Sequence, residues 1–135
     1  MPGNDRLDAI QAAAILAQLP ELNHRIECRQ KIAAAYDSVL GEWVLPRDTG
    51  SNISVYAFCH PKRDRLRHLL AERGVSTAIY YDTPLSQHAL VLQSQDCPEA
   101  EKFCQQVLSL PCHVGLTDDD VGYVCQVLAT LIRCV

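Results

Sequence analysis

The stretch from residue 54 to residue 81, SVYAFCHPKRDRLRHLLAERGVSTAIYY, contains the pattern that decides the fold of this chain. Residues 54–59 are rich in aromatic and β-branched side chains, which indicates a strand. Residues 64–73 carry leucines at helical spacing ahead of Gly74, a residue typical of the end of a helix. Residues 75–81 indicate a second strand. The succession of strand, helix and strand predicts either a βαβ-type unit or a small α+β sandwich.

The segment before this unit has a helical pattern. Its apolar residues recur at spacings of three and four, with Arg29 as the charged member of the stripe. Pro20 lacks an amide hydrogen and disfavours helical geometry at the residue before it. We therefore expect either two helices in series, at about residues 6–18 and 20–40, or one long kinked helix. Gly41 is the expected stop.

The C-terminal third is also expected to be largely helical. One helix begins at Pro98, and its apolar residues continue to Leu108. A short extended piece, residues 109–113, follows. The last helix begins at Thr117, whose hydroxyl can cap the free amide groups, with acidic residues 118–120 in its positive first turn.

Together these patterns predict an α+β fold. We expect a long N-terminal helical arm, residues 1–41, followed by a small α+β domain, residues 42–135, in which a sheet of about three strands packs against helices. The arm has no partner hairpin in the sequence. It is therefore expected to pack against a surface outside its own domain.

The composition narrows the classes of function. The chain has 135 residues, with 12 Lys and Arg against 16 Asp and Glu, so its formal net charge is −4. Because no overall positive field is available to hold nucleic acid or an anionic membrane, we expect neither as a partner. The first residues show no pattern of a signal peptide or a membrane span. The seven cysteines form no C-x-x-C pair, which fits reduced thiols, and we expect a cytoplasmic protein.

Three clusters of reactive or charged residues allow two interpretations each. His24 and Cys28 form only half of a zinc site, and a structural or incidental cysteine is the favoured interpretation. Acidic residues 118–120 favour helix capping over a divalent-cation site. The basic residues between Lys62 and Arg73 favour a solvated helix face over a phosphate-binding or partner-binding edge. We predict no metal site and, without a nucleophile or nucleotide-loop motif, no catalytic residue.

Four motifs in chain order resemble the C-terminal part of the pyridoxal-phosphate-dependent nucleotide-sugar aminotransferases, the DegT/StrS type of the fold type I aminotransferases. They are NDRLDAIQAA at residues 4–13, RQKIAAAYDSVL at 29–40, residues 54–57 with 63–66 and 74–85, and residues 98–101 with 107–113. The resemblance covers essentially the whole chain. Within the family it is similar to the branch that aminates the 3-keto group of acetamido-uronic or related nucleotide sugars.

The resemblance implies a reaction that this chain does not complete alone. In that family an amino group moves, usually from glutamate, to a keto sugar linked to a nucleotide, and a lysine of a large N-terminal domain holds the cofactor as a Schiff base. Lys31, Lys62 and Lys102 match other positions of the family. Met1 falls just before the first motif, so we expect the chain to begin after the lysine-bearing segment. We expect no cofactor for the chain alone, and pyridoxal phosphate only if a large domain completes it.

The resemblance also implies roles for individual residues. Asn4 matches an asparagine that reaches the cofactor phosphate of a neighbouring subunit, and Arg6 belongs to the same motif. A helix N-cap and a surface arginine are the alternatives for these two cofactor-binding candidates. The candidates for binding the nucleotide sugar are Tyr81, Pro84, Leu85, Ser86 and His113.

The chain departs from the family pattern at the substrate end of its motifs. Ser86 stands where many members have His or Asn, Asp82 replaces a common proline, and Val114 follows His113 where proline is usual. These are the positions at which relaxed selection or a new ligand is expected to show.

Three functions remain open from the sequence. The leading hypothesis is a stand-alone C-terminal domain that does not catalyse alone and serves as an oligomerising or accessory module. The second is one half of a split or truncated aminotransferase that transfers an amino group from glutamate to a keto nucleotide sugar. The third is a homo-oligomer whose arm pairs with its own copy, around a small anionic ligand near residues 62–67. The expected partner is therefore a second copy or a large aminotransferase domain.

Overall fold

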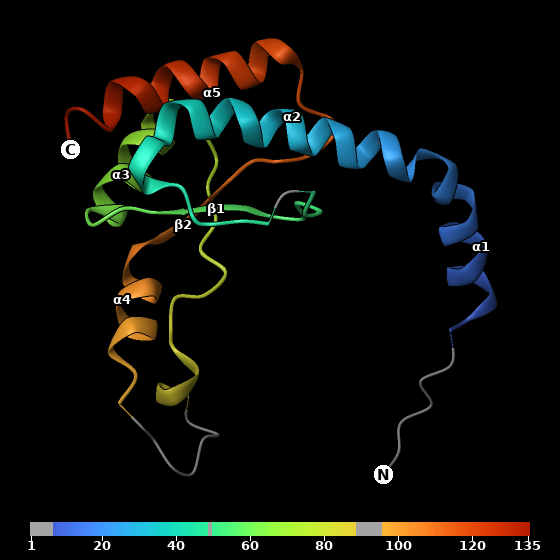
Figure 1. Cartoon of the computed structure of the whole chain (residues 1–135), viewed down its shortest axis with the longest axis horizontal. Helices are drawn as coiled ribbons and strands as arrows, with labels where there is room; N and C mark the ends of the chain where they lie inside the picture. The colour runs from blue at the N-terminus through green and yellow to red at the C-terminus, as the bar shows by residue number, and fades with distance from the viewer. Residues whose placement is uncertain (1–6, 49, 89–95) are drawn as a thin grey trace.

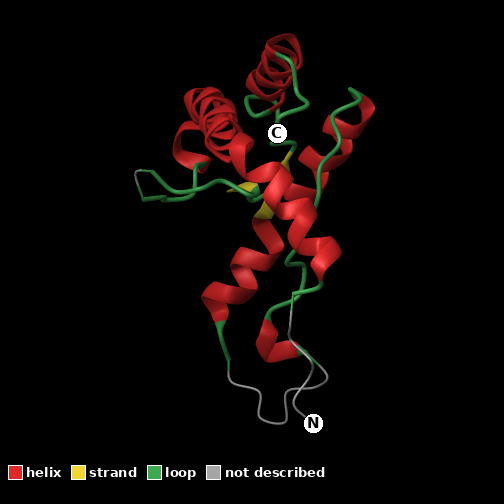
Figure 2. Ribbon diagram, turned by 90° about the vertical axis from the view of Figure 1, so that its right-hand side faces the viewer, coloured by secondary structure: helices red, strands yellow, loops and turns green. Residues whose placement is uncertain are grey.

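A computed structural model describes residues 7–48, 50–88 and 96–135 of the chain. It contains both helices and a small sheet, so the α+β class is confirmed (Figures 1 and 2). In chain order the elements are α1 (Ala9–Gln18), η1 (Leu19–Glu21), α2 (Leu22–Leu40), η2 (Gly41–Trp43), β1 (Tyr56–Cys59), α3 (Arg63–Glu72), η3 (Leu85–Gln87), α4 (Pro98–Gln106), β2 (Val107–Leu110) and α5 (Asp118–Leu131), where η denotes a 3-10 turn.

The sheet has two strands among the described residues, so the expectation of about three is not met. β1 and β2 run antiparallel, with Tyr56 opposite Leu110 and Cys59 opposite Val107. The expected strand over residues 75–81 is reduced to a single bridge, in which the amide and carbonyl of Ala78 bond Ser109 at 3.0 and 2.8 Å. Among residues 75–81 only Val75 is buried, so the segment lacks the alternating burial of an amphipathic strand.

The order of these segments resolves the two interpretations of the strand, helix and strand succession. Ser109 of β2 pairs with Ala57 on one side and with Ala78 on the other. Because both pairings are antiparallel, the segment around Ala78 runs parallel to β1, with β2 between them. The unit is therefore a βαβ arrangement that is split by a strand from much later in the sequence.

The core lies between the sheet and helices α2, α3 and α5 (Figure 1). The Tyr36 and Tyr56 rings meet edge to face at 5.1 Å. The hydroxyl of Tyr36 donates to the carbonyl of Pro111 at 3.0 Å, and that of Tyr56 donates to Asp37 at 2.6 Å. Such hydrogen-bonded aromatics bury large areas without an orphaned hydroxyl, so they fix α2 against the sheet.

The end of α4 differs from the sequence prediction, and the start of α5 agrees with it. The helix expected to reach Leu108 ends at Gln106, because Val107 and Leu108 pair with β1 and are buried as part of β2. Helix α5 starts as predicted. Thr117 accepts from the amide of Asp120, and Asp120 accepts from the amide of Thr117, which is a complete capping box.

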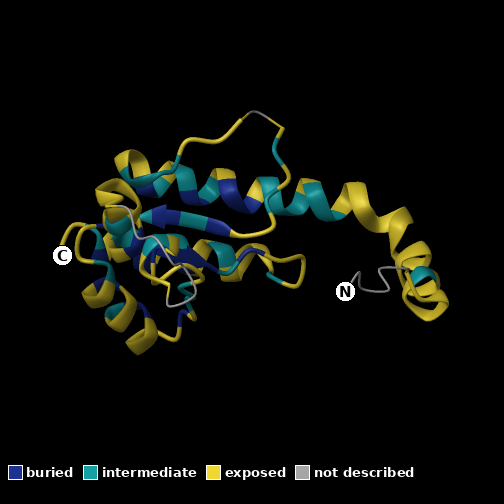
Figure 3. Ribbon diagram, turned by 90° about the horizontal axis from the view of Figure 1, so that it is seen from below, coloured by how far each residue is buried: buried dark blue, intermediate teal, exposed yellow. Residues whose placement is uncertain are grey.

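The N-terminal part of the chain is two helices in series, one of the two predicted alternatives. Pro20 lies in η1 between α1 and α2, and Asp8 caps α1 by accepting from the amide of Ile10 at 2.7 Å. Helix α2 ends at Gly41, whose positive φ of 54° is a conformation that side chains rarely adopt. Figure 3 shows that burial in α2 lies in its second half, whereas α1 has no buried residue.

Among the described residues, no helix is both long and apolar enough to cross a bilayer. The cytoplasmic location remains a prediction.

Candidate functional site

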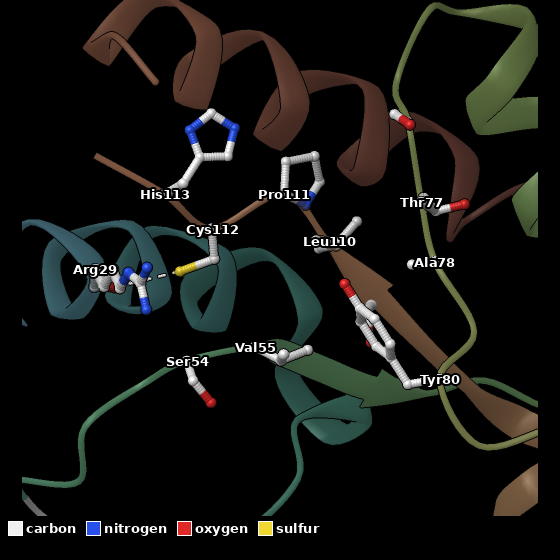
Figure 4. Close-up of a pocket in the computed structure, with 12 residues that line it drawn as sticks. Arg29, Ser54, Val55, Thr77, Ala78, Tyr80, Leu110, Pro111, Cys112 and His113 are labelled. Atoms are coloured by element: carbon white, nitrogen blue, oxygen red, sulfur yellow. Dashed lines mark hydrogen bonds between the residues drawn. The ribbon is translucent and has the colours of Figure 1, made fainter. Parts of the chain in front are cut away.

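A groove of about 400 Å³ opens where α2, the approach to β1, the Ala78 segment and the end of β2 meet (Figure 4). This size is within the range of small-molecule sites. Its lining comes from four parts of the sequence: Arg29; Ser54 and Val55; Ser76, Thr77, Ala78 and Tyr80; and Ser109, Leu110, Pro111, Cys112 and His113. The split sheet creates the groove, because it places β2 and the Ala78 segment side by side.

Arg29 is the charged anchor at one end of the groove. Its Nη1 donates to the carbonyl of Ile53 at 3.3 Å, and its backbone carbonyl accepts from the Cys112 thiol at 3.8 Å. Its Nε is buried and has no hydrogen-bond partner among the described residues. No described carboxylate forms an ion pair with it, and no acidic residue lines the groove. The sequence pattern places Arg29 on the apolar stripe of the predicted helix and gives no reason for a charged residue there.

Cys112 is not activated as a nucleophile. Burial raises the pKa of its thiol, and the charges of Arg29 and Arg47 oppose that rise only in part. The thiol is therefore protonated at neutral pH, and the thiolate is the nucleophilic form of cysteine. Its contribution to the groove is packing and a weak hydrogen bond to α2.

The groove gathers some of the predicted substrate residues and leaves others outside. His113 lines it, but Tyr81 does not, and Tyr80 takes its place (Figure 4). Neighbouring side chains on an extended backbone face opposite sides, so only one tyrosine of the pair can face the groove. The bridge of Ala78 to β2 places Tyr80 on the groove side, since residues two apart share a face, and this long-range bridge left no signal in the sequence.

The remaining predicted substrate residues lie at η3: Pro84 precedes it, and Leu85 and Ser86 belong to it. Pro84 is buried, Leu85 is exposed, and none of the three, Ser86 included, lines the groove. The hydroxyl oxygen of Ser86 is buried without a hydrogen-bond partner in the described part of the chain. Asn4 and Arg6 lie outside the described residues. The roles of these residues in binding substrate or cofactor remain predictions.

The other clusters from the sequence have structural contacts. Cys28 Sγ lies 3.6 Å from Nε2 of His24, but no group of three metal-binding side chains gathers among the described residues. The capping hydrogen bonds from Thr117 lower the pKa of Asp120. Arg63 pairs with Asp64 at 2.6 Å and donates to two backbone carbonyls near β2.

The lysines of the chain lie away from the groove. Pyridoxal phosphate needs an amine for a Schiff base. Lys31, Lys62 and Lys102 are all the lysines of the chain, and none of them lines the groove. Lys62 bonds the carbonyl of Val135, and Lys31 lines a separate cavity between α2 and α5. This groove therefore has no lysine among the described residues that line it, and the expectation of no cofactor for the chain alone remains a prediction.

This fold and groove define a small α+β domain of the kind found in aminotransferases, and a family comparison identifies it further. The model of the DegT/DnrJ/EryC1/StrS aminotransferase family matches residues 2–129. The chain therefore belongs to this family.

Individual relatives agree with that assignment. The chain is 36% identical to the UDP-2-acetamido-2-deoxy-3-oxo-D-glucuronate aminotransferase of Pseudomonas aeruginosa over 93% of its own length and 36% of the relative's. It is 34% identical to the pleiotropic regulatory protein of Geobacillus stearothermophilus, over 96% of the chain and 38% of that relative. The chain thus spans little more than a third of the curated relatives it matches.

Solved structures give the same picture. S. venezuelae DesV, solved in complex with a ketimine intermediate, superposes with a TM-score of 0.86 at 28% identity, over 96% of this chain and 38% of that one. A DegT DnrJ EryC1 StrS aminotransferase from Brucella abortus superposes with a TM-score of 0.82 at 29% identity, over 93% and 36%. The fold of this chain is one part of those larger proteins.

Proposed function

We propose that this chain is the small-domain part of a pyridoxal-phosphate-dependent aminotransferase that acts on a keto nucleotide sugar, and that it does not transaminate alone. Membership of the family supports the reaction class, and the name of the Pseudomonas aeruginosa relative supports the substrate class. None of the three lysines lines the groove, which supports an amine for the cofactor that comes from another domain or chain.

The exposed helix α1 is the observation that carries the proposal. None of its residues is buried, and two of its large apolar side chains lie open to solvent: Ile10 is 82% exposed and Leu16 is 66% exposed. A helix of ten residues is marginal in water without tertiary packing. Apolar side chains gathered on an unpacked helix mark a surface that another protein surface covers. We propose that a large aminotransferase domain is this partner.

An accessory role without any large domain is the second candidate. The same exposed face of α1 favours it, because two copies of the chain can cover each other's arms. Light scattering across a range of concentrations distinguishes the two candidates: a stable dimer of the purified chain supports self-association. A monomer at every concentration contradicts self-association and favours a large domain as the partner of the arm.

A chimera tests the main proposal. In the Pseudomonas aeruginosa relative, the C-terminal region that matches this chain is replaced by the chain itself. We expect the chimera to convert that relative's keto nucleotide sugar at a measurable rate. A chimera that folds and carries the cofactor, as judged by its visible absorbance, but shows no turnover would contradict the proposal.

The chain alone supplies the complementary test. After incubation with pyridoxal phosphate we expect no stable lysine adduct in the visible spectrum. An adduct band that a single Lys→Arg replacement abolishes would contradict the proposal that the chain does not transaminate alone, because that lysine would then be a specific cofactor site.

A further inference from the structure

The groove at the end of β2 contains a cation without a counter-ion. Arg29 is one of only 12 basic residues against 16 acidic ones, yet its guanidinium meets no described carboxylate. A charge that is partly removed from water is costly unless hydrogen bonds or an opposite charge compensate it. The chain is acidic overall, yet no acidic residue lines the groove around Arg29, which favours an external anion as its partner.

The guanidinium has one hydrogen bond to the backbone and one buried nitrogen without a partner among the described residues. Nη1 donates to the carbonyl of Ile53, whereas Nε is buried with no partner among the described residues. A guanidinium carries five N–H donors in a rigid plane that suits two-oxygen groups such as carboxylate and phosphate. The bond from Nη1 to the carbonyl of Ile53 restrains one edge of this plane, and a side chain that is restrained before binding loses less entropy when a ligand binds.

The rest of the groove suits a hydroxyl-rich ligand. In Figure 4 Arg29 lies at one end and Tyr80 at the other, with His113 along one wall. The hydroxyl groups of Ser54, Thr77 and Tyr80 can each donate and accept. Together with the imidazole they offer hydrogen bonds to sugar hydroxyls, and the arginine offers the site for an anion.

We infer that the groove is an anion-selective sugar subsite in which Arg29 binds a carboxylate or phosphate group carried by the sugar. Binding is a property of this chain alone. Only the assignment of the anion to an aminotransferase substrate rests on the proposed function. In such a substrate, an anionic group on the sugar would distinguish one nucleotide sugar from another. Arg29 is then the residue that determines specificity for an acidic substrate.

The test is NMR titration of the purified chain with three probes. Methyl β-D-glucuronide supplies a carboxylate, glucose 1-phosphate supplies a phosphate, and methyl β-D-glucoside is the neutral match. We expect saturable shifts at Ala78, Ser109 and the His113 ring with at least one anionic sugar, and none with the neutral one. The anion that binds identifies the source of the negative charge. Equal shifts with the neutral sugar, shifts that map only to the exposed arginines of α3, or no shifts at all would overturn the inference.

Charge-neutralising variants test the role of Arg29 directly. We expect Arg29→Gln to weaken binding of the anionic sugar at least tenfold, since charge-assisted hydrogen bonds are among the stronger ones. Arg65→Gln, which removes an exposed charge of α3, is the matched control and should change affinity less than about twofold. Equal losses in the two variants would show a nonspecific charge effect and would refute the inference.

Two measurements keep the test decisive if Arg29→Gln does not fold. Arg29→Lys keeps the charge but loses the planar fork, and it should bind the same probe more weakly than the wild type. The titration of the wild-type chain needs no variant. The chimera described above can fail while this titration succeeds, so the two proposals are separable.

Discussion

Helices α1 and α5 are both rich in apolar residues, and their environments differ completely. Helix α5 buries Val124, Val127, Leu128 and Leu131 against α2 and α3, whereas α1 buries nothing. The spacing of apolar residues shows that a helix has a face to cover, but it does not show what covers it. The cover of α5 comes from within the chain, and that of α1 does not come from any described residue.

The same contrast runs along α2. Its second half contributes Ile32, Ala33, Tyr36 and Leu40 to the core, and its first half is exposed or only partly buried. The packed body and the exposed arm therefore meet inside one continuous helix. Perturbations of the body should change global stability, and perturbations of the arm should change only local order and association.

Truncation of one core residue and one arm residue should give the largest difference. We expect Leu128→Ala to lower the free energy of unfolding by about 2–5 kcal/mol, because Leu128 is fully buried and its removal leaves a cavity. Ile15→Ala, on the half-exposed face of α1, should change it by less than about 0.5 kcal/mol. Urea unfolding followed by the fluorescence of Trp43, the single tryptophan, measures both. A comparable loss in the two variants would show that the arm is packed in solution.

This contrast also shows where sequence reasoning succeeded. The α+β class follows from the order of helical and extended patterns along the chain. The interruption at Pro20, the stop at Gly41 and the cap at Thr117 follow from local chemistry, namely a missing amide hydrogen, a positive φ and a hydroxyl acceptor. Each of these features is decided by one or two residues, so the sequence is sufficient to predict it.

The features that the sequence did not reveal depend on contacts between distant segments. Val107 and Leu108 continue the helical spacing of α4, but pairing with β1 makes them a strand. Tyr80 lines the groove because Ala78, two residues before it, bridges Ser109, a partner 31 positions later in the numbering, and the role of Tyr81 in binding substrate stays a prediction. The arginine on the predicted stripe of α2 could be recognised as a groove residue only when the loop before β1 and the end of β2 were placed beside it.

Removal of the caps of α5 and α1 should change the free energy of unfolding by an intermediate amount, and the effect should again differ between the packed body and the exposed arm. Thr117→Ala should cost about 1 kcal/mol of global stability, since α5 is part of the core. Asp8→Ala removes the corresponding cap of α1 and should leave global stability unchanged while amide exchange in α1 becomes faster. Hydrogen exchange by mass spectrometry reads both effects in one experiment. If Asp8→Ala lowers the unfolding free energy as much as Thr117→Ala, the arm and the body unfold as one unit.

The smallest expected effect is a change in the pH dependence of stability, and it belongs to the body alone. His60 is buried beside Trp43, and its Nδ1 accepts from the amide of Lys62 at 3.1 Å. Burial lowers the pKa of His60 in the folded chain, and the charge of Lys62 lowers it further. The unfolded chain therefore binds more protons than the folded chain once the pH falls to the ordinary pKa of histidine, so this contribution to stability is complete above that pKa and is lost below it.

We expect His60→Asn, which keeps a hydrogen-bond acceptor but cannot be protonated, to flatten the decline of the unfolding free energy between pH 7.5 and about pH 5. His68→Asn, at an exposed histidine of α3, is the matched control that separates the loss of a buried imidazole from the loss of a histidine in general. Urea titrations at several pH values give the slopes. Identical slopes for the wild type and His60→Asn would mean that the acid sensitivity of the body comes from its carboxylates, such as Asp120 in the cap of α5, whose pKa is also lowered.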